Sequence, residues 1–272
     1  MATKVGISLR GPQAGMDADA SLETLSKLLK VIAELERTEG QKNSKSKVSR
    51  WTFQELRLGS VNATLEPLEL APESSYTTLE RVLEQMVGGF EAAEKTAELP
   101  PRWTPRAARL GADAVRRLGA SPDVGMELLL YGATPLRVDV TQRAHQNLRA
   151  AVVERYTSFG SRRGHLNSLF DTDKGTIKGV LKSEVGNERI PLVCPESLRE
   201  DLRGAWGEDR VEVTGNIIEN ARGQVMRIIV DDLEILPTEP SLTAEELKGG
   251  FWPDMTGGLS AREHLAVIRG EA

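Results

Sequence analysis

Short runs of alternating apolar and polar residues fill the stretch from residue 164 to residue 237. They cover residues 166–170, 176–182, 188–193, 211–218 and 225–236. A period of two is typical of half-buried strands, and residues 196–203, between the third and fourth runs, instead have a helical pattern. This order of three strands, one helix and two strands predicts a small closed five-stranded β-barrel over residues 164–237.

The first part of the chain mixes both periods. Strand-like alternation covers residues 4–9, 51–58, 61–68, 126–131 and 136–140. Helical patterns cover residues 21–37, 77 to about 99, 104–118 and 141–155. In residues 21–37 one apolar stripe contains Leu22, Leu25, Leu28, Leu29, Ile32 and Leu35. These elements predict an α+β domain over residues 1–157, with helices on an antiparallel or mixed sheet of undetermined topology.

Helix starts and a linker are also predicted. Thr77 with Glu80 forms a capping-box pattern, and Thr104-Pro105 places proline at the favoured first helical position. The small and polar residues 158–163 predict a linker between the first domain and the barrel.

The last segment, residues 241–272, differs from the rest of the chain. Two further capping-box patterns predict short helices, and the irregular stretch between them presents Phe251, Trp252 and Met255. In the final helix Arg262 and Arg269 share a face, with Leu265 and Ile268 alongside. An amphipathic helix of this kind can dock in an apolar groove and reach carboxylates, so these seven residues are the candidate partner-binding residues.

Composition limits the class of protein. The charged content of 28% and hydrophobic content of 39% are ordinary for a globular protein, and no apolar run approaches the roughly 18 residues of a membrane span. Cys194 is the only cysteine, which fits a reducing compartment, and we expect a cytoplasmic bacterial protein. Residues 164–237 hold 9 Lys and Arg against 14 Asp and Glu, so the predicted barrel is acidic as a whole.

No reactive constellation stands out, so the sequence predicts no catalytic residue, no metal site and no cofactor. The histidines His145, His165 and His264 are scattered, and phosphate-loop, dinucleotide-binding and nucleophile-elbow motifs are absent from the sequence. Cys194 precedes a predicted helix, which could activate a thiol, but we interpret it as a buried apolar residue.

The element order over residues 164–237 resembles the OB-fold. That resemblance implies oligonucleotide binding on the face of the second and third strands, which usually needs aromatic platforms and a basic groove. Here those strands supply Lys178, Lys182 and Arg189 but no aromatic residue. This departure favours protein binding or a structural role.

Residues 252–269 resemble the C-terminal tails of bacterial antitoxins that wrap PIN-domain ribonucleases. The resemblance implies a toxin–antitoxin system, in which the tail docks on a PIN-type nuclease. We therefore expect a non-enzymatic, two-domain binding protein. Two alternatives stay open: a nucleic-acid-binding protein that uses the barrel and the basic helix 102–117, and an enzyme whose site is assembled from residues distant in sequence.

Overall fold

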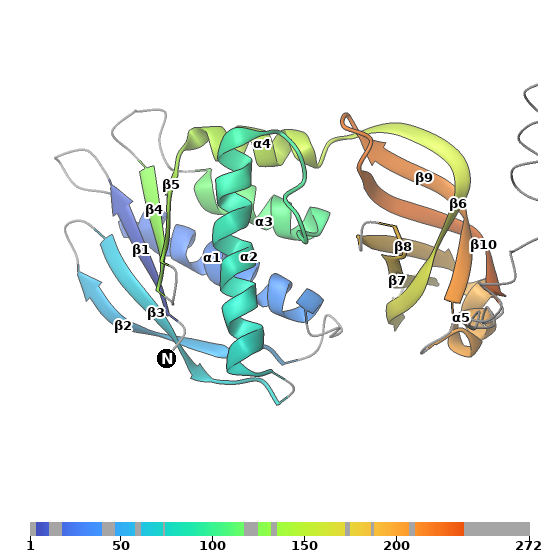
Figure 1. Ribbon diagram of the computed structural model, residues 1–272, viewed down its shortest axis with the longest axis horizontal. Helices are drawn as coiled ribbons and strands as arrows, with labels where there is room; N and C mark the ends of the chain where they lie inside the picture. Colours follow the sequence, from blue (N-terminus) through green and yellow to red (C-terminus); the bar gives the residue numbers. More distant parts are fainter. Residues whose placement is uncertain are drawn as a thin grey trace, which may run out of the picture. The chain divides into compact units, whose positions relative to one another are not determined.

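The structure, a computed structural model, describes residues 4–10, 18–39, 47–57, 61–72, 74–116, 125–131, 135–171, 175–185, 188–206 and 210–236. These residues form a mixed α/β structure with two five-stranded sheets and five α-helices (Figure 1). None of the described helices is both long and apolar enough to cross a membrane.

The first sheet consists of β1 (Lys4–Arg10), β2 (Arg50–Arg57), β3 (Val61–Glu69), β4 (Gly125–Tyr131) and β5 (Leu136–Val140). The strand order is β2-β3-β1-β4-β5, and every neighbouring pair is antiparallel. The sequence left an antiparallel or a mixed sheet open, and the sheet is antiparallel. The strands predicted at residues 51–58 and 61–68 are confirmed as β2 and β3, which pair with each other.

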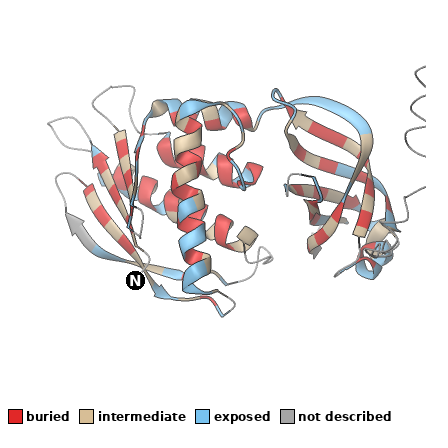
Figure 2. Cartoon of the chain, in the orientation of Figure 1, coloured by how far each residue is buried: buried red, intermediate tan, exposed pale blue. Residues whose placement is uncertain are grey.

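Four helices cover one face of this sheet: α1 (Ala18–Glu39), α2 (Tyr76–Lys95), α3 (Pro105–Val115) and α4 (Gln142–Ala151) (Figure 1). Their buried faces and the alternate residues of the strands form one core (Figure 2). In α1 the predicted apolar stripe is buried at Leu25, Leu28, Ile32 and Leu35. The prediction was wrong for Leu22, which is 57% exposed near the start of the helix.

Several predicted helix boundaries also differ from the structure, including the end of α2, which lies at Lys95 and not at about residue 99. Helix α2 was predicted to start with Thr77 as its cap, but it begins at Tyr76 and its cap is Ser75. The hydroxyl of Ser75 accepts a hydrogen bond from the backbone N–H of Thr78 at 3.1 Å. Helix α4 ends at Ala151, four residues before its predicted end. The start of α3 is confirmed: Thr104 accepts from the backbone N–H of Ala107 at 3.1 Å, and Pro105 is the first helical residue.

The residues predicted as a linker belong to a strand. Strand β6 (Glu154–Asp171) is continuous through residues 158–163 and pairs there with β9 (Arg210–Asn220). The prediction failed because residues 153–159 are all exposed, so burial imposes no alternation on them. The described residues up to Leu236 form one compact unit, and a domain boundary near residues 157–164 stays a proposal.

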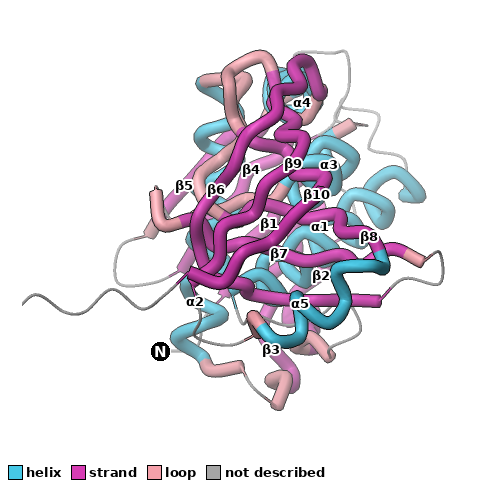
Figure 3. Tube along the Cα trace, turned by 90° about the vertical axis from the view of Figure 1, so that its right-hand side faces the viewer, coloured by secondary structure: helices cyan, strands magenta, loops and turns pink. Residues whose placement is uncertain are grey.

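The second sheet is a closed barrel of β6, β7 (Thr176–Ser183), β8 (Arg189–Pro195), β9 and β10 (Val225–Leu236), in the order β10-β8-β7-β6-β9 (Figure 3). A 3₁₀ turn (Glu196–Leu198) and α5 (Arg199–Gly204) connect β8 to β9. The pair β8–β10 is parallel and the other pairs are antiparallel. The predicted element order is confirmed, and the barrel is OB-like.

A glycine makes room for the bend that closes the barrel. Strand β6 pairs with β9 along its first part and with β7 along its last part, and the two pairings meet at Gly164. A Cβ atom at this position would overlap the carbonyl of Lys182 on β7. The close approach of two backbones therefore requires glycine here.

Candidate anion-binding site

Three cations gather on the outer face of β7 and β8. Alternate residues of both strands, such as Leu181 and Ile190, are buried inside the barrel. The remaining residues point outward, and in the register of the two strands Lys182 lies opposite Arg189 and Lys178 opposite Val193. Because opposite residues share a face of the sheet, Lys178, Lys182 and Arg189 lie together, with no acidic residue in either strand. We call these three residues the basic face.

Two acidic residues of the barrel are paired with arginines. Glu212 on β9 pairs with Arg163 at 2.9 Å, and Glu184 pairs with Arg210 at 2.6 Å. These arginines lower the pKa of both carboxyl groups, with Ser161 contributing the largest effect at Glu212 through its hydroxyl. The net acidity of residues 164–237 therefore does not describe the basic face.

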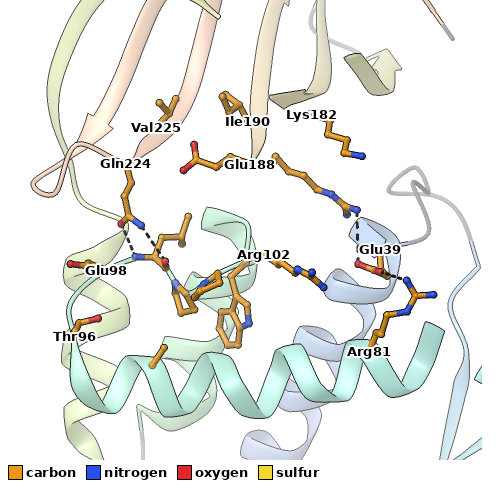
Figure 4. A pocket seen from close by; sticks show the side chains of 16 residues that line it. Glu39, Arg81, Thr96, Glu98, Arg102, Lys182, Glu188, Ile190, Gln224 and Val225 are labelled. Atoms are coloured by element: carbon orange, nitrogen blue, oxygen red, sulfur yellow. Dashed lines mark hydrogen bonds and ion pairs between the residues drawn. The ribbon is translucent and has the colours of Figure 1, made fainter. Parts of the chain in front are cut away.

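A pocket of about 770 Å³ lies at the end of the basic face (Figure 4). Its walls come from the end of α1, from α2, from residues 96–103, from the ends of β7 and β8 and from the β9–β10 turn. The pocket thus brings residues of the first sheet's helices next to Lys182 and Arg189 of the barrel.

The charges in this pocket are unevenly distributed. Arg81, Arg102, Lys182 and Arg189 lie around the single carboxylate of Glu39, and we call this group the basic end (Figure 4). Glu39 is already engaged: Arg81 lies 3.2 Å from it, Gln85 donates to it at 3.0 Å, and Arg189 lies at 4.0 Å. Four cations against one carboxylate leave a local excess of positive charge at this end, while Glu98 and Glu188 line the other side of the pocket.

Arg189 experiences this excess directly. The pKa of Arg189 is lowered, mainly by burial. The carboxylate of Glu39 raises this pKa in part, and the positive charge of Arg102 lowers it further. The two guanidinium groups therefore repel each other in a partly desolvated place. An anion bound between them would relieve that repulsion.

Arg102 occupies an unusual backbone conformation. Its φ of 64° is the one positive φ of a non-glycine residue among the described residues. It is the third residue of a turn in which the N–H of Trp103 donates to the carbonyl of Pro100 at 3.0 Å. Such a turn favours glycine, because a Cβ atom crowds the backbone at positive φ, or asparagine, whose side chain can form a local hydrogen bond there.

Trp103 anchors this turn on α2. Its indole is 4% exposed, its Nε1–H donates to the carbonyl of Gln85 at 2.8 Å, and its ring lies edge-on to Phe90 with centroids 5.3 Å apart. The turn is also tied to the barrel, since the side chain of Gln224 accepts from the N–H of Leu99 at 2.7 Å and donates to its carbonyl at 3.2 Å (Figure 4). These contacts hold Arg102 at the mouth of the pocket.

Two arginines of the basic helix predicted at residues 102–117 form ion pairs with helix α1. In α3, Arg106 pairs with Glu34 at 3.4 Å, and just after α3 Arg116 pairs with Glu23 at 3.7 Å. Both partners belong to α1, so these arginines form surface ion pairs. Of the predicted basic residues, Arg102 precedes the helix and lines the pocket, and Arg117 lies outside the described residues.

The candidate residues of the tail cannot be placed. Phe251, Trp252, Met255, Arg262, Leu265, Ile268 and Arg269 all lie outside the described residues, as does the whole of the predicted segment 241–272.

Cys194 is buried inside the barrel, as predicted, and burial raises its pKa to about 12. A thiol in this state is a poor nucleophile at neutral pH. Within the described part of the chain, no three His, Cys, Asp or Glu side chains lie close enough together to hold a metal ion. His145 is buried, with its Nδ1 2.7 Å from the carbonyl of Ala112.

Comparison with known proteins gives little further information. No family model matches the chain, and no curated protein matches it. Among solved structures, a chain of the S. pombe Stn1–Ten1 complex matches at 15% identity with a TM-score of 0.22, over 44% of this chain and 78% of that one.

Proposed function

We propose that the protein binds single-stranded nucleic acid through its phosphates. The bound nucleic acid would lie along the basic face and reach the pocket. The observation that carries this proposal is the sorting of charge on the barrel: Lys178, Lys182 and Arg189 share one face and continue into Arg81 and Arg102. Backbone pairing of β7 with β8 fixes the positions of Lys178, Lys182 and Arg189, and the buried Trp103 fixes the turn that carries Arg102.

The chemistry of the track favours phosphate contacts over base stacking. Between the cations lie Val180, Pro191 and Val193. These side chains are apolar and half-buried, and none of them is aromatic. Binding should therefore depend little on base sequence and strongly on salt. The proposed role includes no catalytic step.

Fluorescence anisotropy with labelled oligothymidine of about ten nucleotides tests this function. Each phosphate neutralised on a single strand contributes about −0.7 to the slope of log K against log salt, so five cations give a slope of up to about −3.5. Lys178→Glu should weaken binding and make the slope less steep by about 0.7 or more. Lys30→Glu on the exposed side of α1 is the matched control and should bind as the wild type does.

Equal binding by Lys178→Glu and Lys30→Glu would contradict the proposal, and so would binding that does not change with salt. Circular dichroism of both variants checks that each is folded.

Docking of the tail on a protein partner, with a PIN-type nuclease as the specific partner, is a second proposal that rests on the sequence. Three large apolar residues, Phe251, Trp252 and Met255, lie in a stretch that the sequence predicts to be irregular, where they would need a surface to cover them. Deletion of residues 251–272 should abolish copurification with the product of a neighbouring gene. If the truncated chain still copurifies with every partner of the full chain, this proposal is wrong.

A further inference from the structure

The basic end of the pocket has more positive charge than an internal phosphate of a strand would need. A phosphodiester carries one negative charge, whereas a phosphate monoester carries about −1.5 to −2 at neutral pH and has three acceptor oxygens. Arg81, Arg102, Lys182 and Arg189 exceed the charge of Glu39 by three. This excess matches a monoester better than a diester.

The geometry also fits an end rather than the middle of a strand. The basic face is open on the outside of β7 and β8, but at Lys182 and Arg189 it meets α2 and the turn of residues 100–103. Glu98, Glu188 and Gln224 line the other side of the pocket, away from the basic end (Figure 4). A polyanion that enters along β7 and β8 would meet carboxylates if it continued across the pocket.

The conformation of Arg102 is an independent observation. A positive φ costs a residue with a Cβ atom of the order of 1 kcal/mol or more relative to glycine. Glycine or asparagine would relieve this strain at the same turn position. Among the described residues no carboxylate forms an ion pair with Arg102, so no ion pair within the described chain offsets the strain. A ligand that binds the guanidinium of Arg102 would explain why arginine occupies this strained position.

We infer that the basic end binds a phosphate monoester, held by the guanidinium groups of Arg102 and Arg189 with Lys182 and Arg81 beside them. This inference rests on the proposed function in so far as the monoester is the terminal phosphate of the bound strand. Arginine suits this role because its planar fork of N–H donors matches two phosphate oxygens at once.

The test compares three oligothymidines of equal length that end in a 5′-phosphate, a 3′-phosphate or hydroxyl groups only, by anisotropy with the full chain. One of the two phosphorylated strands should bind about tenfold or more tightly than the hydroxyl-ended strand, as expected for charge-assisted hydrogen bonds. Arg102→Gly should remove this preference and leave the melting temperature equal or higher, because glycine relaxes the turn. Arg143→Gln, at an exposed position of α4, is the control and should keep the preference.

Arg102→Asn provides a second variant, because asparagine also tolerates a left-handed conformation. It should lose the preference even if Arg102→Gly proves less stable than the wild type. Equal affinities for all three strands would overturn the inference while the proposed function stands. A preference that survives both Arg102 variants would overturn it too.

Titration with a nucleoside 5′-monophosphate separates the two proposals further. If this ligand binds the wild type and not Arg102→Gly, while no oligonucleotide binds, then the pocket takes a small phosphate monoester and the proposed function is wrong. If neither the monophosphate nor any oligonucleotide binds at low salt, both proposals are wrong.

Discussion

At the scale of single residues, burial decides the chemistry of Cys194. The thiol lies inside the barrel and its pKa of about 12 is well above its ordinary value of 9.0. The folded state therefore holds this proton more tightly than the unfolded state does. The resulting stabilisation is complete below about pH 9 and is lost as the pH rises toward about 12.

We predict that the free energy of unfolding falls between about pH 8 and about pH 10.5, and that Cys194→Ala reduces the fall because no thiol is left to ionise in the unfolded chain. Urea titrations of both proteins at the two pH values measure this difference. A folded wild type whose thiol reacts readily with a disulfide reagent at about pH 8 would contradict the burial argument.

Glu36 shows what a sequence pattern misses at the same scale. A carboxylate on a helix is expected to face solvent, yet this one is buried in α1. It accepts from the N–H and hydroxyl of Ser49, at 2.9 and 2.8 Å, and from the hydroxyl of Ser74. Its partners lie 13 and 38 residues away along the chain, so no local pattern could indicate them.

At the scale of elements, two adjacent glycines of α2 have opposite roles. A Cβ atom at Gly89 would overlap the indole of Trp103, whereas a Cβ atom at Gly88 would meet nothing within 4 Å. Alanine is a better helix former than glycine by about 1 kcal/mol, so Gly88→Ala should stabilise the protein by up to that amount. Gly89→Ala should instead destabilise it, since overpacking a core costs about 1–3 kcal/mol.

Urea unfolding of the two variants measures the contrast, and binding of oligothymidine extends it. Gly89→Ala should displace Trp103, which anchors the turn that carries Arg102, and should therefore also weaken binding. Gly88→Ala should leave binding unchanged. Equal stability of the two variants would mean that Trp103 does not rest on Gly89 as described.

Elements could be predicted from the sequence where one face is buried and the other is not. Strands β7 to β10 and the helix α2 satisfy this condition, and their positions were predicted to within a few residues. Residues 154–163 of β6 do not, because residues 154–159 are all exposed and no alternation of buried and exposed positions marks them as a strand. Their strand conformation depends on pairing with β9, which is some 50 residues away in the sequence.

At the scale of the whole molecule, three of the five cations of the candidate site could be grouped from the sequence. Lys178, Lys182 and Arg189 belong to predicted strands, and alternation alone puts them on the outside. Arg81 and Arg102 come from segments about 80 to 100 residues earlier, and only the tertiary fold brings them to the same pocket. The excess of acidic residues over residues 164–237 favoured the opposite conclusion, because a net charge carries no information about which face it occupies.

The pocket also depends on how the barrel is joined to the helices of the first sheet. The two hydrophobic cores are separate clusters, so polar contacts contribute much of the connection. Gln224 bonds both backbone groups of Leu99, and the side-chain amide of Asn220 donates to the carbonyl of Ala151 at 2.8 Å. These contacts place the β9–β10 turn against the segment that carries Arg102.

Gln224→Ala should therefore loosen this connection without unfolding either core. It removes two hydrogen bonds to the half-buried backbone of Leu99, each contributing about 0.5–1.5 kcal/mol. Hydrogen exchange should accelerate in residues 97–103 and 220–225 and stay unchanged in the middle of α2 and β9, because opening at the connection is local. Gln146→Ala, at an exposed position of α4, is the control and should exchange as the wild type does. Faster exchange throughout the chain would show instead that Gln224 stabilises the whole fold, and no change in either segment would show that the contact with Leu99 does not hold the turn.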